Sequence, residues 1–106
     1  MRNNFSSEAT PHKSVGLALA KSEETTATIE YMASDVPHVT IQDRGTYYLL
    51  ESESEIRVPF GEVSEFLGRE LSLGGFMVSM SAYFGRTEVD DNEFVVTASA
   101  ELPNTV

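Results

Sequence analysis

The sequence contains no cysteine among its 106 residues. This absence excludes disulfide bonds, thiolate metal sites, iron–sulfur ligation and a cysteine nucleophile. Histidine is also scarce: His12 and His38 lie far apart in the sequence, and neither has an evident catalytic or metal-binding partner. No apolar run is long enough to span a bilayer, and the polar N-terminal segment lacks the apolar core of a signal peptide. We therefore expect a cytoplasmic protein that binds no metal and no cofactor.

Basic residues are few. The chain has 7 Lys and Arg against 17 Asp and Glu, which gives a net charge of −10. Nucleic acids and anionic membranes bind through clustered basic side chains, so this charge argues against both as partners. Strong acidity instead favours solubility and steers a protein toward basic patches on other proteins.

The sequence also lacks the usual catalytic patterns. No serine lies in a G-x-S-x-G elbow, and Gly74-Gly75 lacks the spacing of a phosphate-binding loop, so a bend or bulge is the simpler interpretation of that pair. Acidic residues cluster at 51–55 and 88–93, without the glycine and ligand spacing of an EF-hand. We therefore predict a non-enzyme. One alternative is a small ligand- or metal-sensing α+β module that binds through these acidic loops.

The pattern of residues predicts one small domain. The expected elements, in chain order, are a strand at 15–20, a helix capped by Ser22 and stopped by Pro37, strands at 38–43 and 46–51 around the turn Asp43-Arg44-Gly45, a strand at 55–58, a short helix from Pro59 to Gly68, a long strand at 76–84, and a final strand at 93–100. Most strands are joined by tight turns, so we predict an α+β fold with a mainly antiparallel sheet and two helices packed on it. Residues 1–13 are expected to form a flexible tail, 14–102 the domain and 103–106 a C-terminal tail.

The segment GGFMVSMSAYFGR at 74–86 raises a question of function. As a strand it would place Phe76, Val78, Met80, Ala82 and Phe84 on one apolar face, which belongs in a core. The opposite face would carry Met77, Ser79, Ser81, Tyr83 and Gly85, beside Val95, Thr97 and Ser99 if residues 94–99 pair with 80–88. This second face fits a solvent-exposed surface of a half-buried sheet or a protein-docking surface equally well.

Several stretches, in order, resemble a known family. "VGLAL" resembles its opening strand, and "VTIQDRGTYYLL" resembles its hairpin, with Asp43 and Tyr47 in place. "EIRVPFGEVSEFLGRELSL" resembles its strand and helix ending in Leu-Gly-Arg, and "MVSMSAYFGRTEVDDNEFVV" its last strands. The family is that of the regulatory, or effector, components of bacterial multicomponent di-iron monooxygenases. The sequence looks nearest to the toluene and phenol branch.

This resemblance implies a function. A member of the family is a non-catalytic, cofactor-free effector that docks on the α-subunit of the hydroxylase and couples NADH-derived electrons to hydrocarbon hydroxylation or epoxidation. The resemblance leaves the substrate of the cognate monooxygenase open. For the free protein we expect a monomer as the default state, with dimerisation through an exposed edge strand as the alternative. The residues expected to dock are Met77, Ser79, Ser81, Ala82, Tyr83 and Gly85, with Arg69 and Arg86 as secondary candidates.

Overall fold

The computed structural model describes residues 14–98 and has an α+β fold. Its elements in order are β1 (Val15–Ala20), α2 (Glu23–Asp35), β2 (Thr40–Asp43), β3 (Tyr47–Ser52), β4 (Glu55–Pro59), α3 (Phe60–Leu67), α4 (Leu73–Ser79), β5 (Met80–Phe84), β6 (Arg86–Val89) and β7 (Glu93–Thr97). The predicted fold class is confirmed, with two corrections: there are three helices, and the strands form two sheets. The tails predicted at 1–13 and 103–106 lie outside the described residues.

The larger sheet has four strands in the order β2-β3-β1-β5, and all of its pairs are antiparallel. β1 pairs with β3 on one side, from Val15 opposite Ser52 to Ala20 opposite Tyr47, and with β5 on the other. The predicted hairpin around Asp43-Arg44-Gly45 is confirmed as β2 and β3. There the Asp43 carboxylate accepts a hydrogen bond from the Gly45 amide at 2.9 Å, and Gly45 has a positive φ of 93°.

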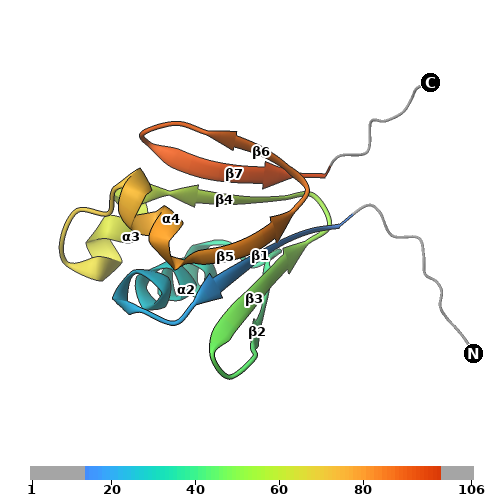
Figure 1. The fold of residues 1–106 in the computed structure, drawn as a ribbon, viewed down its shortest axis with the longest axis horizontal. Coiled ribbons are helices and arrows are strands. Elements are labelled where there is room, and N and C mark those ends of the chain that lie inside the picture. The colour runs from blue at the N-terminus through green and yellow to red at the C-terminus, as the bar shows by residue number, and fades with distance from the viewer. Residues whose placement is uncertain (1–13, 99–106) are drawn as a thin grey trace, which may run out of the picture.

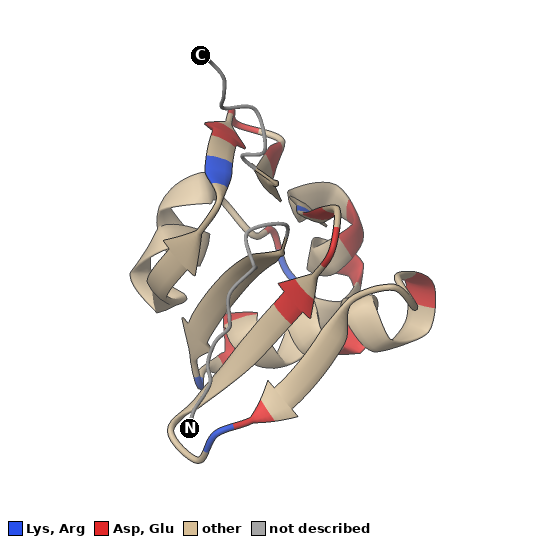
Figure 2. Ribbon diagram, turned by 90° about the vertical axis from the view of Figure 1, so that its right-hand side faces the viewer, with Lys and Arg blue, Asp and Glu red and all other residues tan. Residues whose placement is uncertain are grey.

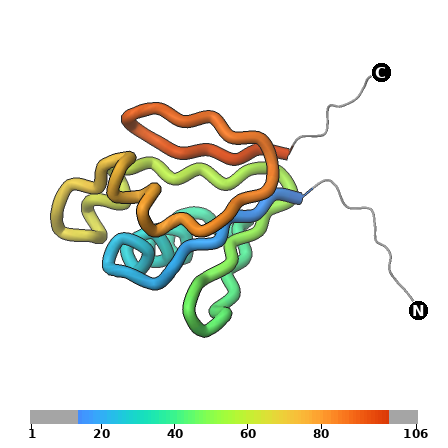
Figure 3. The backbone as a smooth tube through the Cα atoms, viewed as in Figure 1, coloured from blue at the N-terminus to red at the C-terminus, as the bar shows by residue number. Residues whose placement is uncertain are grey.

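The smaller sheet has the order β4-β7-β6 and is also antiparallel. The chain crosses between the sheets at the turn from β3 to β4 and at Gly85, between β5 and β6 (Figure 3). The predicted hairpin of residues 80–88 with 94–99 is therefore only half right. β6 pairs with β7, whereas β5 pairs with β1.

The helices lie together at the end of the molecule opposite the start of β1 and the end of β7 (Figure 1). The Ser22 side chain caps α2 by accepting a hydrogen bond from the Thr25 amide at 3.0 Å, as the sequence predicts. Pro59 precedes α3, and Gly68 ends it in the left-handed conformation with φ of 83°. None of the described helices is both long enough and apolar enough to cross a membrane.

The segment 74–84 is not one strand, and this is the main error of the sequence-based prediction. Residues 73–79 form α4, whose N-cap Ser72 accepts a hydrogen bond from the Gly75 amide at 3.1 Å. Phe76 faces inward from this helix and packs between Phe60 and Phe94, with ring centroids 5.7 and 5.2 Å away. Burial of this ring supports a helix that the two glycines disfavour by propensity.

The core is otherwise apolar and draws on both sheets and all three helices. Its buried members include Leu17, Leu19, Met32, Leu50, Ile56, Val58, Val63, Phe76, Phe94 and Val96. The expectation that Val78, Ala82 and Phe84 belong to the core is wrong, since all three are exposed. Strand alternation does not apply to Val78, which lies on a helix, and β5 is an edge strand.

Gly85 provides the first prediction. It has a φ of 128°, and a Cβ there would lie 2.7 Å from Val96 Cγ2, 2.8 Å from the Thr97 carbonyl oxygen and 3.0 Å from Val15 Cγ1. We expect Gly85→Ala to lower the free energy of unfolding by about 1–3 kcal/mol, because the backbone is strained for an L-residue and the carbonyl leaves no room. Chemical denaturation measures this loss.

Gly61→Ala is the matched control. Gly61 lies in α3, and a Cβ there meets nothing within 4 Å, so the same substitution should stabilise the protein by up to about 1 kcal/mol. Equal effects of the two substitutions would contradict the role assigned to Gly85.

Candidate functional site

The stretch from Leu71 to Gly85 contains no charged residue, in a chain of net charge −10. Acidic positions are instead spread over helices, turns and strands of other segments (Figure 2). β5 lies within this uncharged stretch and forms one edge of the four-stranded sheet, with Ser81 to Phe84 all exposed. Edge strands normally carry charges or proline that prevent pairing with other chains, and β5 has neither. Depletion of charge on an exposed surface is typical of a protein interface.

The pairing of β5 with β1 is irregular at Ser81. Ala82 is opposite Ala18, while Met80 is opposite Leu19, so Ser81 is an extra residue in the ladder. A β-bulge of this kind breaks the regular alternation of side chains and bends the strand. The bulge breaks the alternation at Ser81, while Ala82, Tyr83 and Phe84 pair regularly with β1 and are nevertheless all exposed, where the sequence predicted one buried and one exposed face.

Two aromatic residues end β5, and each is packed on one side only. The Tyr83 side chain is 47% exposed, yet its ring makes an edge-to-face contact with the buried Phe94 ring at 6.3 Å between centroids. The Phe84 ring lies against Gly16 of β1, where a Cβ would overlap it. Both rings are thus held by the core while they present apolar area to solvent. Such rings lose little conformational entropy when a partner covers them.

The end of α4 extends this surface. Val78 is 86% exposed, and Met77 is also exposed. We call the exposed residues Met77, Val78, Ser81, Ala82, Tyr83 and Phe84 the β5 surface. Sequence analysis missed Val78 and Phe84 because it placed them in the core. The signal that could have placed Val78 is Ser72, a favourable N-cap that is followed by the inward-facing Phe76 at helical distance.

Two of the predicted docking residues have evident structural roles. Ser79 is only 6% exposed, and its hydroxyl lies 2.9 Å from the Ser22 hydroxyl, so it is not available to a partner. Gly85 is the crossing point between the two sheets, and its close neighbours are Val15, Val96 and Thr97. The structure therefore corrects the expected exposure of Ser79, because helix periodicity turns its side chain inward, while Gly85 is exposed.

The two arginines lie in different settings. Arg86 is exposed at the start of β6, directly after Gly85. Arg69 Nη2 lies 3.1 Å from a Glu23 carboxylate oxygen and 3.0 Å from a Glu24 carboxylate oxygen, in the first turn of α2. This guanidinium lowers the pKa of the Glu24 carboxyl, and the two carboxylates in turn raise the pKa of Arg69.

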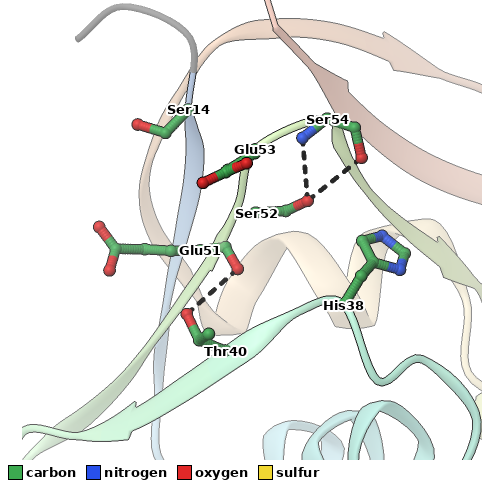
Figure 4. Close-up of a pocket in the computed structure, with 7 residues that line it drawn as sticks. All are labelled: Ser14, His38, Thr40, Glu51, Ser52, Glu53 and Ser54. Carbon is green, nitrogen blue, oxygen red and sulfur yellow. Dashed lines mark hydrogen bonds between the residues drawn. The ribbon is translucent and has the colours of Figure 1, made fainter. Parts of the chain in front are cut away.

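An open pocket of about 700 Å³ lies beside the turn that joins the sheets (Figure 4). Its lining residues are Ser14, His38, Thr40, Glu51, Ser52, Glu53 and Ser54. The Ser52 hydroxyl accepts a hydrogen bond from the Ser54 amide at 3.1 Å, and the Glu51 carboxylate points away from His38. Among the described residues no group of three or more His, Asp or Glu is placed to hold a metal ion. The pocket therefore shows no arrangement of nucleophile and base and no metal site within the described chain.

Known proteins resemble this chain in sequence. The profile of the MmoB/DmpM family matches residues 13–97. Methane monooxygenase regulatory protein B of Methylococcus capsulatus is 33% identical in an alignment 90 residues long, which covers 79% of this chain and 64% of that protein. The chain thus spans slightly less than two thirds of the length of this curated relative.

Solved structures resemble it in fold. The structure of the soluble methane monooxygenase regulatory protein B has a TM-score of 0.67 at 30% identity, covering 90% of this chain and 72% of the other. A chain in the structure of a phenol hydroxylase–regulatory protein complex has a TM-score of 0.71 at 17% identity, covering 79% and 97%. Both the methane and the phenol branches are represented among the relatives, so the toluene and phenol branch stays a prediction.

The ion pairs of Arg69 give a pH-dependent prediction. Because the pKa of Glu24 is lowered in the folded state, the stabilisation by Arg69 is present above the ordinary value of 4.5 and is lost as the pH falls through the lowered pKa. We expect Arg69→Gln to reduce the melting temperature slightly at neutral pH, since the pair is exposed, and to leave it unchanged in acid. Denaturation curves over a series of pH values test this.

Arg44→Gln is the control, because the exposed Arg44 side chain bonds the Gln42 amide oxygen and no carboxylate of the described residues. It removes the same charge without breaking an ion pair. A destabilisation by Arg69→Gln that persists undiminished in acid would rule out the Glu24 pair as its cause.

Proposed function

Because this chain belongs to the MmoB/DmpM family, we propose that it is a non-catalytic effector that docks on the hydroxylase of a multicomponent di-iron monooxygenase. The match over residues 13–97 carries this proposal, since it spans the whole fold except its last described residue. The names of the relatives support it. One is a monooxygenase regulatory protein, and another is seen in a complex of phenol hydroxylase with its regulatory protein.

The β5 surface is the proposed point of contact. Its side chains Met77, Ser81, Ala82 and Tyr83 are exposed and uncharged, and two of them are small. Small side chains let a partner approach the backbone, while Met and Tyr supply adaptable or rigid apolar area. Arg86 and Gly85 border this surface at the far end of β5. Ser79 and Arg69 are not part of this surface. They bond to the start of α2, Ser79 through the Ser22 hydroxyl and Arg69 through the Glu24 carboxylate.

The mechanism we propose is a shift of conformational population. An effector changes the hydroxylase only if it binds the active conformation more tightly than the resting one. Docking through β5 would then control the access of oxygen and substrate to the di-iron centre of the hydroxylase, and so couple NADH-derived electrons to hydroxylation or epoxidation. The acidic remainder of the surface would accelerate association with a basic region of the partner. We place the protein in the cytoplasm, as a monomer when free.

The alternative, a metal- or ligand-sensing module, receives less support. The acidic residues 51–55 join the two sheets, and within the described chain they form no metal-binding group with His38. Calorimetric titration with Ca²⁺ or Mg²⁺ separates the two functions, because an effector should give no stoichiometric heat.

The main experiment reconstitutes a hydroxylase of this class with its reductase, titrates in this protein, and records hydroxylated product per NADH consumed. A saturable rise in that ratio is the expected result, because a bound effector directs electrons to substrate. The same ratio at all concentrations, with no physical capture by any of several hydroxylases, would overturn the proposal.

Ser81→Arg tests the surface itself. A bulky cation at the exposed bulge of β5 should block close approach of the hydroxylase and reduce the apparent affinity by at least about tenfold, while the fold stays intact. Circular dichroism and thermal melting check the fold, and the coupling assay gives the affinity.

Ser34→Arg is the matched control. Ser34 is exposed near the end of α2, so the same substitution adds the same charge away from β5. Equal loss of stimulation in both variants, or full stimulation by a folded Ser81→Arg protein, would argue against the β5 surface.

A further inference from the structure

Ser79 is the last residue of α4 and directly precedes β5. Its side chain is buried, and its hydroxyl lies 2.9 Å from that of Ser22, which is 57 positions earlier in the chain. A hydroxyl pair between such distant segments costs chain entropy to form, and a buried hydroxyl without a partner is unfavourable. The pair therefore connects the N-cap of α2 to the residue that directly precedes β5.

The Ser22 hydroxyl takes part in further hydrogen bonds at the start of α2. The Thr25 hydroxyl donates to the Ala20 carbonyl oxygen at 2.5 Å, so the Ser22 hydroxyl can donate to Thr25 Oγ1 at 3.2 Å. Ser22 Oγ also accepts from the Thr25 amide. Ser22 has one hydroxyl proton, and when that proton goes to Thr25 Oγ1 the Ser79 hydroxyl is the donor to Ser22; in the pair itself either hydroxyl can donate. The result is a network of hydroxyl hydrogen bonds that links Ser79 through Ser22 and Thr25 to the carbonyl oxygen of Ala20.

These hydroxyl hydrogen bonds begin where the backbone ladder between β1 and β5 ends. The last pair of that ladder is Leu19 with Met80, just past the bulge at Ser81, and Ala20 is the final residue of β1. Beyond that pair, the hydroxyl hydrogen bonds connect Ser79, the residue before β5, to Ala20 at the end of β1. They thus lie beyond the Leu19–Met80 pair, on the side of the bulge opposite the Ala18–Ala82 pair.

We propose that Ser79 is a positioning residue for the β5 surface. Its hydroxyl fixes the start of β5 to the N-cap of α2 and so holds the bulged Ser81 in the orientation in which it contacts the partner. This inference rests on the proposed function for the identity of the partner. The positioning itself is a property of the free protein and can be measured without a hydroxylase.

The test compares Ser79→Ala with the native protein in two measurements. In the free protein, hydrogen exchange of the amides from Met80 to Tyr83 should become about tenfold faster, because the strand loses its anchor at one end. With a hydroxylase that binds the native protein, the affinity should fall about three- to tenfold, the equivalent of one hydrogen bond.

Ser64→Ala is the matched control, and it separates positioning from general stability. The Ser64 hydroxyl donates to the Phe60 carbonyl at 2.6 Å and accepts from the Leu71 amide at 2.7 Å, so its removal also breaks bonds of a half-buried hydroxyl. Both variants are compared at a temperature where each is fully folded. Ser64→Ala should change neither the exchange in β5 nor the affinity. If Ser79→Ala does not fold, Ser79→Cys replaces it, since a thiol keeps the volume and is a weak donor.

The outcomes are distinct. Faster exchange in β5 and weaker binding for Ser79→Ala alone support the inference. Unchanged exchange in β5, or the same changes in both variants, would overturn it. If the native protein binds no hydroxylase, the proposed function fails, and the exchange measurement still decides whether Ser79 positions β5.

Discussion

Strand β1 is paired along both of its edges, and both the core and the candidate site depend on that pairing. Val15, Leu17 and Leu19 are completely buried between the sheets and helices, while every residue of β1 has a partner in β3. The opposite edge carries β5, so the exposed strand is held by the most buried strand of the protein. An edge strand fixed in this way can expose uncharged side chains and keep a defined shape, which a loop of the same composition could not do.

Glycines next to β1 set the limits of this arrangement. Gly16 leaves room for the Phe84 ring to lie across the strand, and Gly85 lets the backbone turn from one sheet to the other beside Val15. Both positions accept no side chain without movement of a neighbour. The position of the Phe84 ring therefore depends on the absence of a side chain at Gly16, whereas the Tyr83 ring packs against Phe94.

Charge and apolar contact are separated on the molecule. The acidic residues of the described chain lie on α2, α3, the turns and the strands other than β1 and β5, while the uncharged stretch 71–85 contains all of α4 and β5. Long-range charge affects mainly the rate of association, whereas close packing of apolar and small side chains determines how long a complex lasts. A protein whose proposed task is to bind one conformation of an enzyme benefits from this separation, because the contact that discriminates conformations needs no buried charge.

The sequence by itself determined the elements whose signals are local. Ser22 and Pro37 bound α2, Gly45 marks the hairpin of β2 and β3, and Gly68 ends α3, because each of these residues acts on its own few neighbours. The ordered motifs of the chain also pointed to the family. The candidate site was predicted in part: Met77, Ser81, Ala82 and Tyr83 are exposed, as a docking surface requires.

Only the tertiary structure decided the segment from 73 to 84. A short apolar run fits a helix or a strand equally well by periodicity. The choice depended on Phe60 and Phe94, which are distant in sequence and enclose Phe76 only when residues 73–79 are helical. In this helix Ser79 faces inward to Ser22 and Val78 is in solvent. The division of the strands between two sheets likewise depends on which remote strands pair. These features depend on packing between remote segments, and local sequence carries no record of which segments will meet.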